Sequence, residues 1–244
     1  MEIGGIIMIV LAIVSDIYAI DLLKADGRII YNDCHDALQH GNNKSDFYMV
    51  RFYTSEPFEV YCRFGVNGPG IPIMTQKFGS VNFARGWHDY EYGFGIQSSG
   101  DFWLGLSRIK MLTDTGYQIL TLTLKDWTRD IRTIRYNYFA LGPASLRYPL
   151  HIGKYVTSHV LPDDFAFSNG MPFATIDRPD ANKCAYHQKG GWWYNYCSQT
   201  LPTGHYYHYG PYIPAGFFYD GIYYKDWKGF AYSLKYISLE LYHI

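Results

Sequence analysis

The chain has 244 residues, enough for one large domain or two small ones. Aromatic residues make up 19% of it and charged residues only 18%, which excludes a disordered chain because there is ample apolar area to bury. The formal net charge is -1 and no basic stripe occurs, so nothing in the charge pattern favours nucleic-acid binding.

The first residues are typical of an export signal. Residues 6–14 form an unbroken apolar run and Ala19 offers a small residue for cleavage, so residues 1–19 are predicted to be a signal peptide. Glu2 stands where a basic residue is usual, and the alternatives are an uncleaved anchor or a buried strand. The run is shorter than the roughly 20 residues that span a bilayer. We expect a secreted, extracellular protein without a membrane span, in which residues 20–32 form a short link.

Four cysteines suggest two disulfides formed in an oxidising compartment. They allow three pairings, and the simplest joins sequence neighbours, Cys34 with Cys62 and Cys184 with Cys197. A zinc site is the alternative, but no C-x-x-C and no zinc-finger spacing occurs. Asn43 begins an Asn-Lys-Ser glycosylation sequon, which is consistent with secretion.

Two helices are expected in the first half of the chain. Residues 80–92 place aromatic side chains on one helical face at i, i+4 and i+7. Ser80 can cap the start of this helix and Gly93 can end it. Residues 104–112 are predicted to form a second, shorter helix.

Strands are expected to follow. Residues 117–124 alternate, with Leu120, Leu122 and Leu124 on one face, which indicates a half-buried strand. Residues 162–214 are rich in Gly, Pro, Asn and His, so they should form a loop-built region held by the second disulfide. The fold class is therefore predicted to be α+β, an antiparallel sheet with a few helices before a loop-rich end. Further strands are predicted at residues 134–139, 148–152, 231–236 and 238–242.

A series of short motifs runs along the chain, each weak alone but specific in its order. They are DC at 33–34, FEVYC at 58–62, GSVNF at 79–83, WHDY at 87–90, FWLGL at 102–106, MPFATID at 171–177, GGWWY at 190–194, DGI at 220–222 and WKG at 227–229. From residue 33 to 244 the chain resembles the fibrinogen C-terminal (fibrinogen-related) domain family, which includes fibrinogen, ficolins, tachylectins and angiopoietin-like ligands.

The resemblance implies a fibrinogen C-terminal globular domain made of three subdomains. The first holds one disulfide, the central one holds the antiparallel sheet, and the loop-rich C-terminal one holds the second disulfide, a calcium site and a ligand pocket. It also implies secretion and no enzymatic activity. The chain agrees with the last point, since it contains no GxSxG, HExxH or GxxxxGK motif.

The ligand pocket that the resemblance implies lies beside the second disulfide. In the lectin members it is an aromatic funnel that accepts an acetyl group. Here Ser198 stands where a His is common in those lectins, and Gln188 stands where an aromatic or acidic residue is usual. The alternative is that these side chains simply pack the loop. The pocket positions map onto Gln188, Tyr196, Ser198, Phe218 and Tyr219, with Tyr212 or Tyr209 near the remaining wall position.

A calcium site is also implied, at residues that could supply several hard oxygen ligands. Asp177 and Asp180 are the candidates, but the family's alternating Asp pair is lost and Arg178 and Lys183 add positive charge. Calcium is therefore a possible cofactor, but the site that would bind it has lost part of the family pattern. The alternative is that these residues form a solvated turn.

Two other aromatic groups invite a functional interpretation. Trp192 and Trp193 could be sugar platforms, but the resemblance favours a scaffold role. The two histidines at 205 and 208 could bind a metal on a helix, but the flanking Gly204 and Gly210 favour a loop.

The main functional hypothesis is a secreted, lectin-like recognition protein of innate defence. It would bind carbohydrate or acetylated groups in the pocket beside Cys197, and weak single-site affinity would call for multivalency, as in a homo-oligomer. The alternative is an extracellular ligand, signalling or structural, that uses the same end to bind a cell-surface protein.

Overall fold

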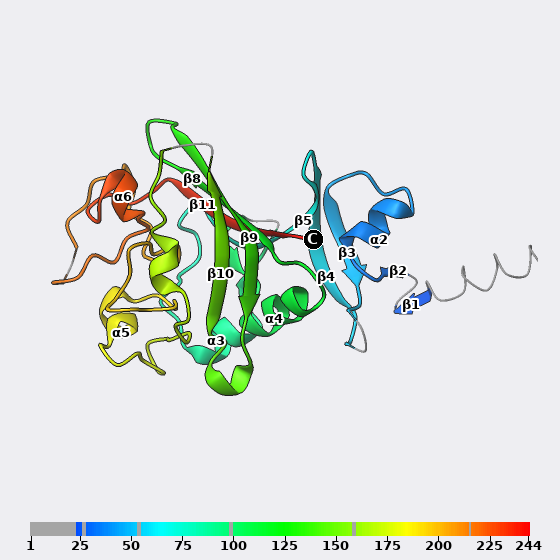
Figure 1. Ribbon diagram of the computed structural model, residues 1–244, viewed down its shortest axis with the longest axis horizontal. Coiled ribbons are helices and arrows are strands. Elements are labelled where there is room, and N and C mark those ends of the chain that lie inside the picture. Colours follow the sequence, from blue (N-terminus) through cyan, green and yellow to red (C-terminus); the bar gives the residue numbers. More distant parts are fainter. Residues whose placement is uncertain (1–22, 26–27, 53–54, 98–99, 158–159, 215) are drawn as a thin grey trace, which may run out of the picture. The chain divides into compact units, whose positions relative to one another are not determined.

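A computed structural model describes residues 23–25, 28–52, 55–97, 100–157, 160–214 and 216–244. The predicted signal peptide, residues 1–19, lies outside the described residues. The chain divides into two units, Met1–Pro69 and Gly70–Ile244, and each is described by itself (Figure 1).

The first unit contains a small mixed sheet. Strands β2 and β3 pair in parallel, whereas β1 with β2 and β3 with β4 pair antiparallel. Two of these strands lie in the stretch that we expected to be a short link, and Ile30 and Tyr31 are buried there. The link prediction missed them because strands of three and four residues are too short to give a recognisable periodic pattern. The strands are β1 (Leu23–Ala25), β2 (Arg28–Tyr31), β3 (Asp46–Val50) and β4 (Phe58–Gly65).

The first disulfide joins the one described helix of this unit to its sheet. Helix α2 (Cys34–Gln39) begins after Asp33, whose carboxylate accepts a hydrogen bond from the Asp36 N–H at 2.7 Å. Cys34 in α2 and Cys62 in β4 are both fully buried, with their Cα atoms 5.6 Å apart. The predicted pairing of Cys34 with Cys62 is confirmed.

The second unit is built on an antiparallel sheet in the order β5-β11-β8-β9-β10. Strand β11 comes from the end of the chain, yet it lies between β5 and β8 (Figure 1). The central and C-terminal parts are therefore one unit here, where the resemblance implied two subdomains. A short pair extends the sheet, since β7 pairs with both β5 and β6. The strands are β5 (Gly68–Gln76), β6 (Phe94–Gly95), β7 (Phe102–Trp103), β8 (Ile119–Lys125), β9 (Ile131–Leu141), β10 (Leu150–Thr157) and β11 (Tyr236–Tyr242).

The predicted alternation of β8 is confirmed. Leu120, Leu122 and Leu124 have no exposed surface, while the residues between them are half-buried. Three buried Leu side chains of this size contribute about 1.5 to 3 kcal/mol each to the free energy of unfolding. Strand β11 is buried almost throughout and has a hydrogen-bonded neighbour on both edges.

The helix predicted over residues 80–92 is shorter than expected. Helix α3 (Trp87–Tyr92) begins at Trp87 and ends at Gly93, as predicted for its end. Ser80 does not cap it, because both its backbone N–H and its hydroxyl donate to the Asp101 carboxylate, at 2.6 and 2.8 Å. The second predicted helix is confirmed as α4 (Leu106–Asp114).

The strand predicted at residues 231–236 is wrong except for its last residue. Backbone hydrogen bonds from Ser233 to Gly210 and from Leu234 to Ile222 tie this segment to two loops instead. Of this segment only Ser233 and Leu234, the two residues that make these bonds, are buried. No local signal distinguishes the two arrangements.

The predicted loop-rich region is confirmed. Between residues 160 and 214 the described secondary structure is one 3-10 turn, η2 (Phe165–Ser168), and the short helix α5 (Cys184–Gln188). Two more short elements are η1 (Ala144–Leu146) and α6 (Lys225–Lys228). Among the helices in the described ranges, none has the length and apolar character needed to cross a bilayer.

Candidate functional site

The second disulfide closes a loop whose tryptophans face inward. Cys184 and Cys197 are bonded as predicted, with their Cα atoms 5.1 Å apart. Trp192 and Trp193 have no exposed surface, and the Trp193 indole N–H donates to the Tyr148 carbonyl at 2.8 Å. Both rings are therefore core, and neither offers a face on which a sugar could stack.

Two predicted pocket residues, Gln188 and Ser198, are also buried and bonded to each other. Gln188 is 3% exposed, and its amide donates to the Tyr223 hydroxyl at 2.7 Å and to the Tyr219 carbonyl at 2.5 Å. The Ser198 hydroxyl donates to Gln188 Oε1 at 3.2 Å. Burial raises the pKa of Tyr223 to about 12. Both amide protons of Gln188 are thus used inside the protein.

The other four predicted pocket residues are rings at or near the surface. Tyr196 is 84% exposed, and its backbone has a positive φ of 44°, as does that of Cys197 at 70°. Positive φ at two successive non-glycine residues is unfavourable, and here the disulfide and its neighbours hold it. Tyr212 is half-buried, and its hydroxyl accepts a hydrogen bond from the Gly221 N–H at 2.8 Å.

Two of the surface rings are fixed by stacking. Phe218 lies parallel to His187 with ring centroids 4.5 Å apart, and Tyr219 lies parallel to Phe230 at 5.8 Å. Each of the two is 39% exposed, so one face of each ring is covered and the rest meets solvent. The structure therefore divides the predicted pocket into a buried polar pair and a set of exposed rings.

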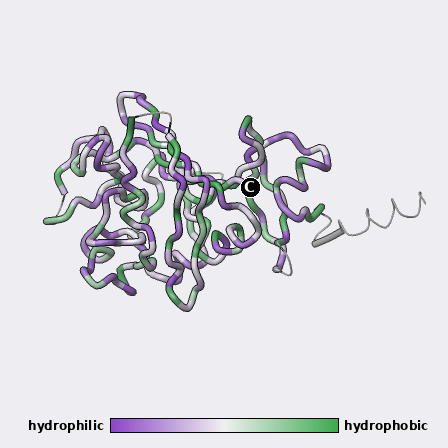
Figure 2. The backbone as a smooth tube through the Cα atoms, viewed as in Figure 1, coloured by the Kyte–Doolittle hydropathy of each residue, from purple (hydrophilic) through white to green (hydrophobic). Residues whose placement is uncertain are grey.

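Two of these surface rings, Phe218 and Tyr219, belong to a projecting loop, residues 216–219, which we call the aromatic loop. Phe217 in this loop is fully exposed, and Figures 1 and 2 show this part of the chain reaching out at the far left with a hydrophobic end. A mainly apolar hollow of about 430 Å³ lies beside it. An exposed apolar loop next to an apolar hollow is typical of an interaction surface. The hollow is lined by Ala84, Ile176, Tyr186, His187, Lys189, Gly216, Phe217 and Phe218.

The candidate calcium ligands serve as caps in this structure. Asp177 Oδ1 accepts hydrogen bonds from the Trp87 N–H at 2.8 Å, at the start of α3, and from the Thr175 hydroxyl at 2.7 Å. Burial raises the pKa of Asp177, but these hydrogen bonds outweigh it and leave the pKa below its usual value. A Cβ at Gly86 would lie 2.9 Å from Asp177 Oδ2, so glycine leaves room for this cap.

Asp180 caps the next turn. Its two carboxylate oxygens accept hydrogen bonds from the backbone N–H groups of Asn182 and Ala185, both at 3.0 Å. In the described part of the chain, no three His, Cys, Asp or Glu side chains form a group that could hold a metal. The residues present fit turn caps better than calcium ligands, and the calcium site stays a prediction.

Asn43 is exposed in the connection between α2 and β3. Its neighbour Lys44 is exposed as well and pairs with Asp46 at 3.1 Å. An accessible connection between two elements is where a glycan can be carried without disturbing the core. Glycosylation of Asn43 stays a prediction.

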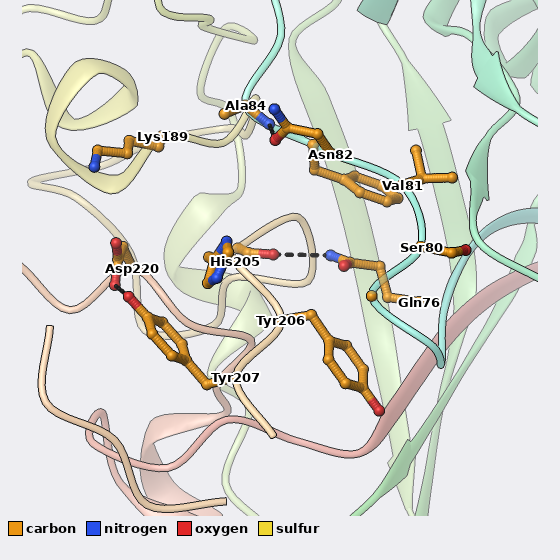
Figure 3. A pocket seen from close by; sticks show the side chains of 13 residues that line it. Gln76, Ser80, Val81, Asn82, Ala84, Lys189, His205, Tyr206, Tyr207 and Asp220 are labelled. Carbon is orange, nitrogen blue, oxygen red and sulfur yellow. Dashed lines mark hydrogen bonds between the residues drawn. The ribbon is translucent and has the colours of Figure 1, made fainter. Parts of the chain in front are cut away.

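Sequence reasoning missed a second, more polar cavity of about 560 Å³, which we call the Asp220 cavity (Figure 3). Two loops form its walls, residues 79–84 and residues 204–207, with Gln76, Lys189 and Asp220 completing the lining. None of the six predicted pocket residues lines it. No motif could have found it, because the loops are 120 residues apart in sequence and meet only in the folded chain.

Comparison with known proteins agrees with this fold. The family of fibrinogen beta and gamma chains, C-terminal globular domain, matches residues 30–243. Angiopoietin-related protein 2 from Homo sapiens is 36% identical over 210 residues, which is 84% of this chain but only 42% of the relative. Fibrinogen-like protein 1 from Bos taurus is 34% identical over 235 residues, 90% of this chain and 74% of the relative.

Solved structures show the same similarity. The fibrinogen-like globe domain of human ANGPTL2 has a TM-score of 0.81 at 35% identity, covering 87% of this chain and 99% of that one. Lamprey fibrin D-dimer, complexed with the peptide ligand Gly-His-Arg-Pro-amide, has a TM-score of 0.78 at 28% identity, covering 96% and 83%. As its ordered motifs predicted, this chain has the fibrinogen-like globe fold and belongs to the fibrinogen C-terminal domain family.

Proposed function

We propose that the protein is a non-enzymatic, extracellular ligand that binds a cell-surface protein through its aromatic loop. The observation that carries the proposal is Phe217, a fully exposed ring in a loop beside an apolar hollow. Exposed apolar patches of this kind mark binding surfaces, and aromatic residues are enriched in the energetic centres of protein interfaces.

The neighbouring rings make the loop a prepared surface. Because Phe218 is stacked on His187 and Tyr219 on Phe230, these side chains lose little conformational freedom when a partner covers them. Stacked rings beside the fully exposed Phe217 ring give a partner preorganised apolar area to cover. The relatives found are named angiopoietin-related and fibrinogen-like proteins, which favours a protein ligand over the lectin hypothesis.

Carbohydrate binding has weaker support. A sugar site needs a few free, directed hydrogen-bonding groups between its rings. Gln188 and Ser198, which would supply them at the predicted funnel, bond to each other and to Tyr223. The non-enzymatic part of the proposal is supported by the lack of the common catalytic motifs in the sequence.

The first experiment measures binding of the tagged, secreted protein to intact cells by flow cytometry, with trypsin-treated cells as the test for a protein partner. We expect Phe217→Ala to weaken binding by about tenfold or more, the loss typical of an interface hot spot. Leu146→Ala is the matched control, because Leu146 is also apolar and exposed but lies in η1, between β9 and β10. Equal binding by wild type and Phe217→Ala would overturn the assignment of the loop.

The same protein is passed over N-acetylglucosamine resin and eluted with acetate. No retention is expected. Retention released by acetate, together with cell binding that survives trypsin, would instead restore the carbohydrate hypothesis and reject the protein-ligand proposal.

A further inference from the structure

We propose that Asn67 is a site of spontaneous deamidation, at which the folded protein gains a negative charge with time. The inference goes beyond the proposed function and does not depend on it, because the reaction needs only water and no partner. The sequence contains the dipeptide Asn-Gly twice, at residues 67–68 and 169–170. Only the first copy is left free to react in the folded chain.

An Asn-Gly dipeptide can react with itself. The Gly68 backbone nitrogen gives its proton to solvent and attacks Asn67 Cγ, so that a bond forms between these two atoms. The bond from Cγ to Nδ2 breaks, and the nitrogen leaves as ammonia after it takes up a proton from solvent. Water then opens the cyclic imide at one of its two carbonyl carbons. The product is aspartate or isoaspartate, in which a neutral amide has become a carboxylate.

Asn67 has the freedom that this reaction requires. Val66 and Asn67 are the two residues between the end of β4 and the start of β5, and both are exposed. Within the described ranges, the Asn67 side chain has no hydrogen bond or ion pair. Its carboxamide can therefore rotate toward the next backbone nitrogen without losing a contact, and water can reach the imide that forms.

Gly68 leaves the attacking nitrogen uncovered. Because glycine has no Cβ, no side chain lies over its own backbone nitrogen. A Cβ placed on Gly68 would have no heavy atom within 4 Å beyond its chain neighbours, so the surroundings are open as well. This open space lets the backbone shift as the five-membered ring closes.

The second Asn-Gly copy is held at both reacting groups. Asn169 Oδ1 accepts a hydrogen bond from the Ile152 N–H at 3.0 Å, which fixes the carboxamide. The Gly170 N–H donates to the Leu150 carbonyl at 2.7 Å, so the nitrogen that would attack is already engaged. Asn169 is exposed like Asn67, and exposure alone does not separate the two copies. Ring closure at Asn169 must first break both hydrogen bonds, which raises its barrier.

The reaction changes the charge of the protein and leaves its fold in place. Each converted molecule is one unit more negative than the formal net charge of -1. The Asn67 side chain is exposed and supports no neighbour within the described ranges, so its conversion removes no contact. An aged preparation is therefore a mixture of two charge forms that share one fold.

The test incubates wild-type protein at neutral pH and body temperature and follows both Asn-Gly peptides by mass spectrometry after digestion. Conversion replaces the amide nitrogen by oxygen, which raises the mass of the peptide. We expect Asn67 to convert at least about tenfold faster than Asn169 in the folded protein. Conversion of Asn67 that is no faster than that of Asn169 would overturn the proposal.

The same measurement in urea separates the folded structure from the local sequence. Unfolding releases the hydrogen bonds of Asn169 and Gly170, so the two copies should then convert at about equal rates. A preference for Asn67 that stays the same size in urea would reject the structural reason given for it.

A pair of matched variants identifies the attacking nitrogen. Gly68 and Gly170 both have positive φ, at 89° and 81°, and open space where a Cβ would lie. Alanine therefore brings similar backbone strain at either position. Gly68→Ala should slow the conversion of Asn67 by about tenfold, and Gly170→Ala should leave it unchanged. An unchanged rate in Gly68→Ala would reject attack by the Gly68 nitrogen.

Asn67→Asp provides the reference for the converted protein. It should elute from an anion-exchange column together with the more acidic fraction that accumulates in aged wild type, and its melting temperature should match that of fresh wild type. If the acidic fraction instead retains an intact Asn67, the charge arises elsewhere and the proposal is wrong.

Discussion

The inner and outer faces of the C-terminal loop region are both rich in aromatic rings, yet they differ in every other respect. On the inner face Trp192 and Trp193 have no exposed surface, and the Gln188 amide donates its hydrogen bonds to neighbouring protein groups. On the outer face Tyr196 is 84% exposed and Phe217 is fully exposed. The comparison teaches that burial and hydrogen-bond partners, and not residue type, separate scaffold from binding surface in this chain.

The largest expected effect tests the inner face. Trp193→Ala should lower the free energy of unfolding by about 3 to 5 kcal/mol, because it opens a large cavity and leaves the Tyr148 carbonyl without its donor. Urea unfolding at equilibrium measures this. A loss under about 1 kcal/mol would mean that the inner face is not a packed core.

The next effect depends on pH and concerns Asp164, beside the inner face. Burial raises the pKa of its carboxyl to about 7, although the Asp226 N–H donates to it at 2.8 Å and lowers the pKa in part. Above the unfolded pKa, about 3.9, the unfolded chain releases this proton first. Stability should therefore fall as pH rises from about 4 to 7 and then level off.

Asp164→Asn removes that titration and should flatten the fall in the free energy of unfolding between pH 4 and 7. Unfolding by urea at several pH values measures the slope. Asp114→Asn is the control, because the Asp114 side chain is 55% exposed and pairs with Lys110 at the surface. An unchanged slope in Asp164→Asn would show that the folded state does not hold the proton on Asp164.

A smaller effect is expected from the buried polar pair. Gln188→Met keeps the volume but leaves Ser198 and Tyr223 with fewer partners, so we expect a loss of about 1 to 3 kcal/mol. Thermal unfolding measures it. If the variant is as stable as wild type, Gln188 is free to face a ligand, and the lectin funnel regains its polar group.

The smallest effect on stability belongs to the outer face. Phe217→Ala should change the free energy of unfolding by less than about 0.5 kcal/mol, because the ring is fully exposed and supports nothing beneath it. A clear destabilisation would show that the aromatic loop is part of the scaffold. The outer face would then contribute to stability as the inner face does.

Much of the fold followed from local patterns. The alternation of Leu120, Leu122 and Leu124 predicted β8, and glycine at position 93 predicted the end of α3. The failures have a common cause. Ser80 was expected to cap a helix, but Asp101, which lies 21 residues away, takes its hydrogen bonds. A sequence pattern reports what a segment favours alone and not which distant group competes for it.

The candidate site shows the same limit more strongly. The family motifs pointed to six pocket residues, and their order alone could not say that Gln188 and Ser198 turn toward each other while Tyr196 turns to solvent. In the sequence Asp220 stood out only as the first residue of the DGI motif at residues 220–222. Its place in a cavity depends on the loops at residues 79–84 and 204–207, the second of which is tied to Gln76 at the end of β5 through the Gly204 carbonyl.

The amino-acid sequence by itself determined the family, the α+β class, both disulfides and the loop-rich end. These features depend on short motifs, residue spacing and periodicity, which can be recognised without knowing which distant segments lie in contact. Only the tertiary structure decided which rings are core and which are exposed, and which carboxylates are caps and which one lines a cavity. The physical reason is that burial and hydrogen-bond partnership are properties of contacts between distant segments, such as Tyr207 with Asp220 and Asp177 with Trp87, and no single segment carries them.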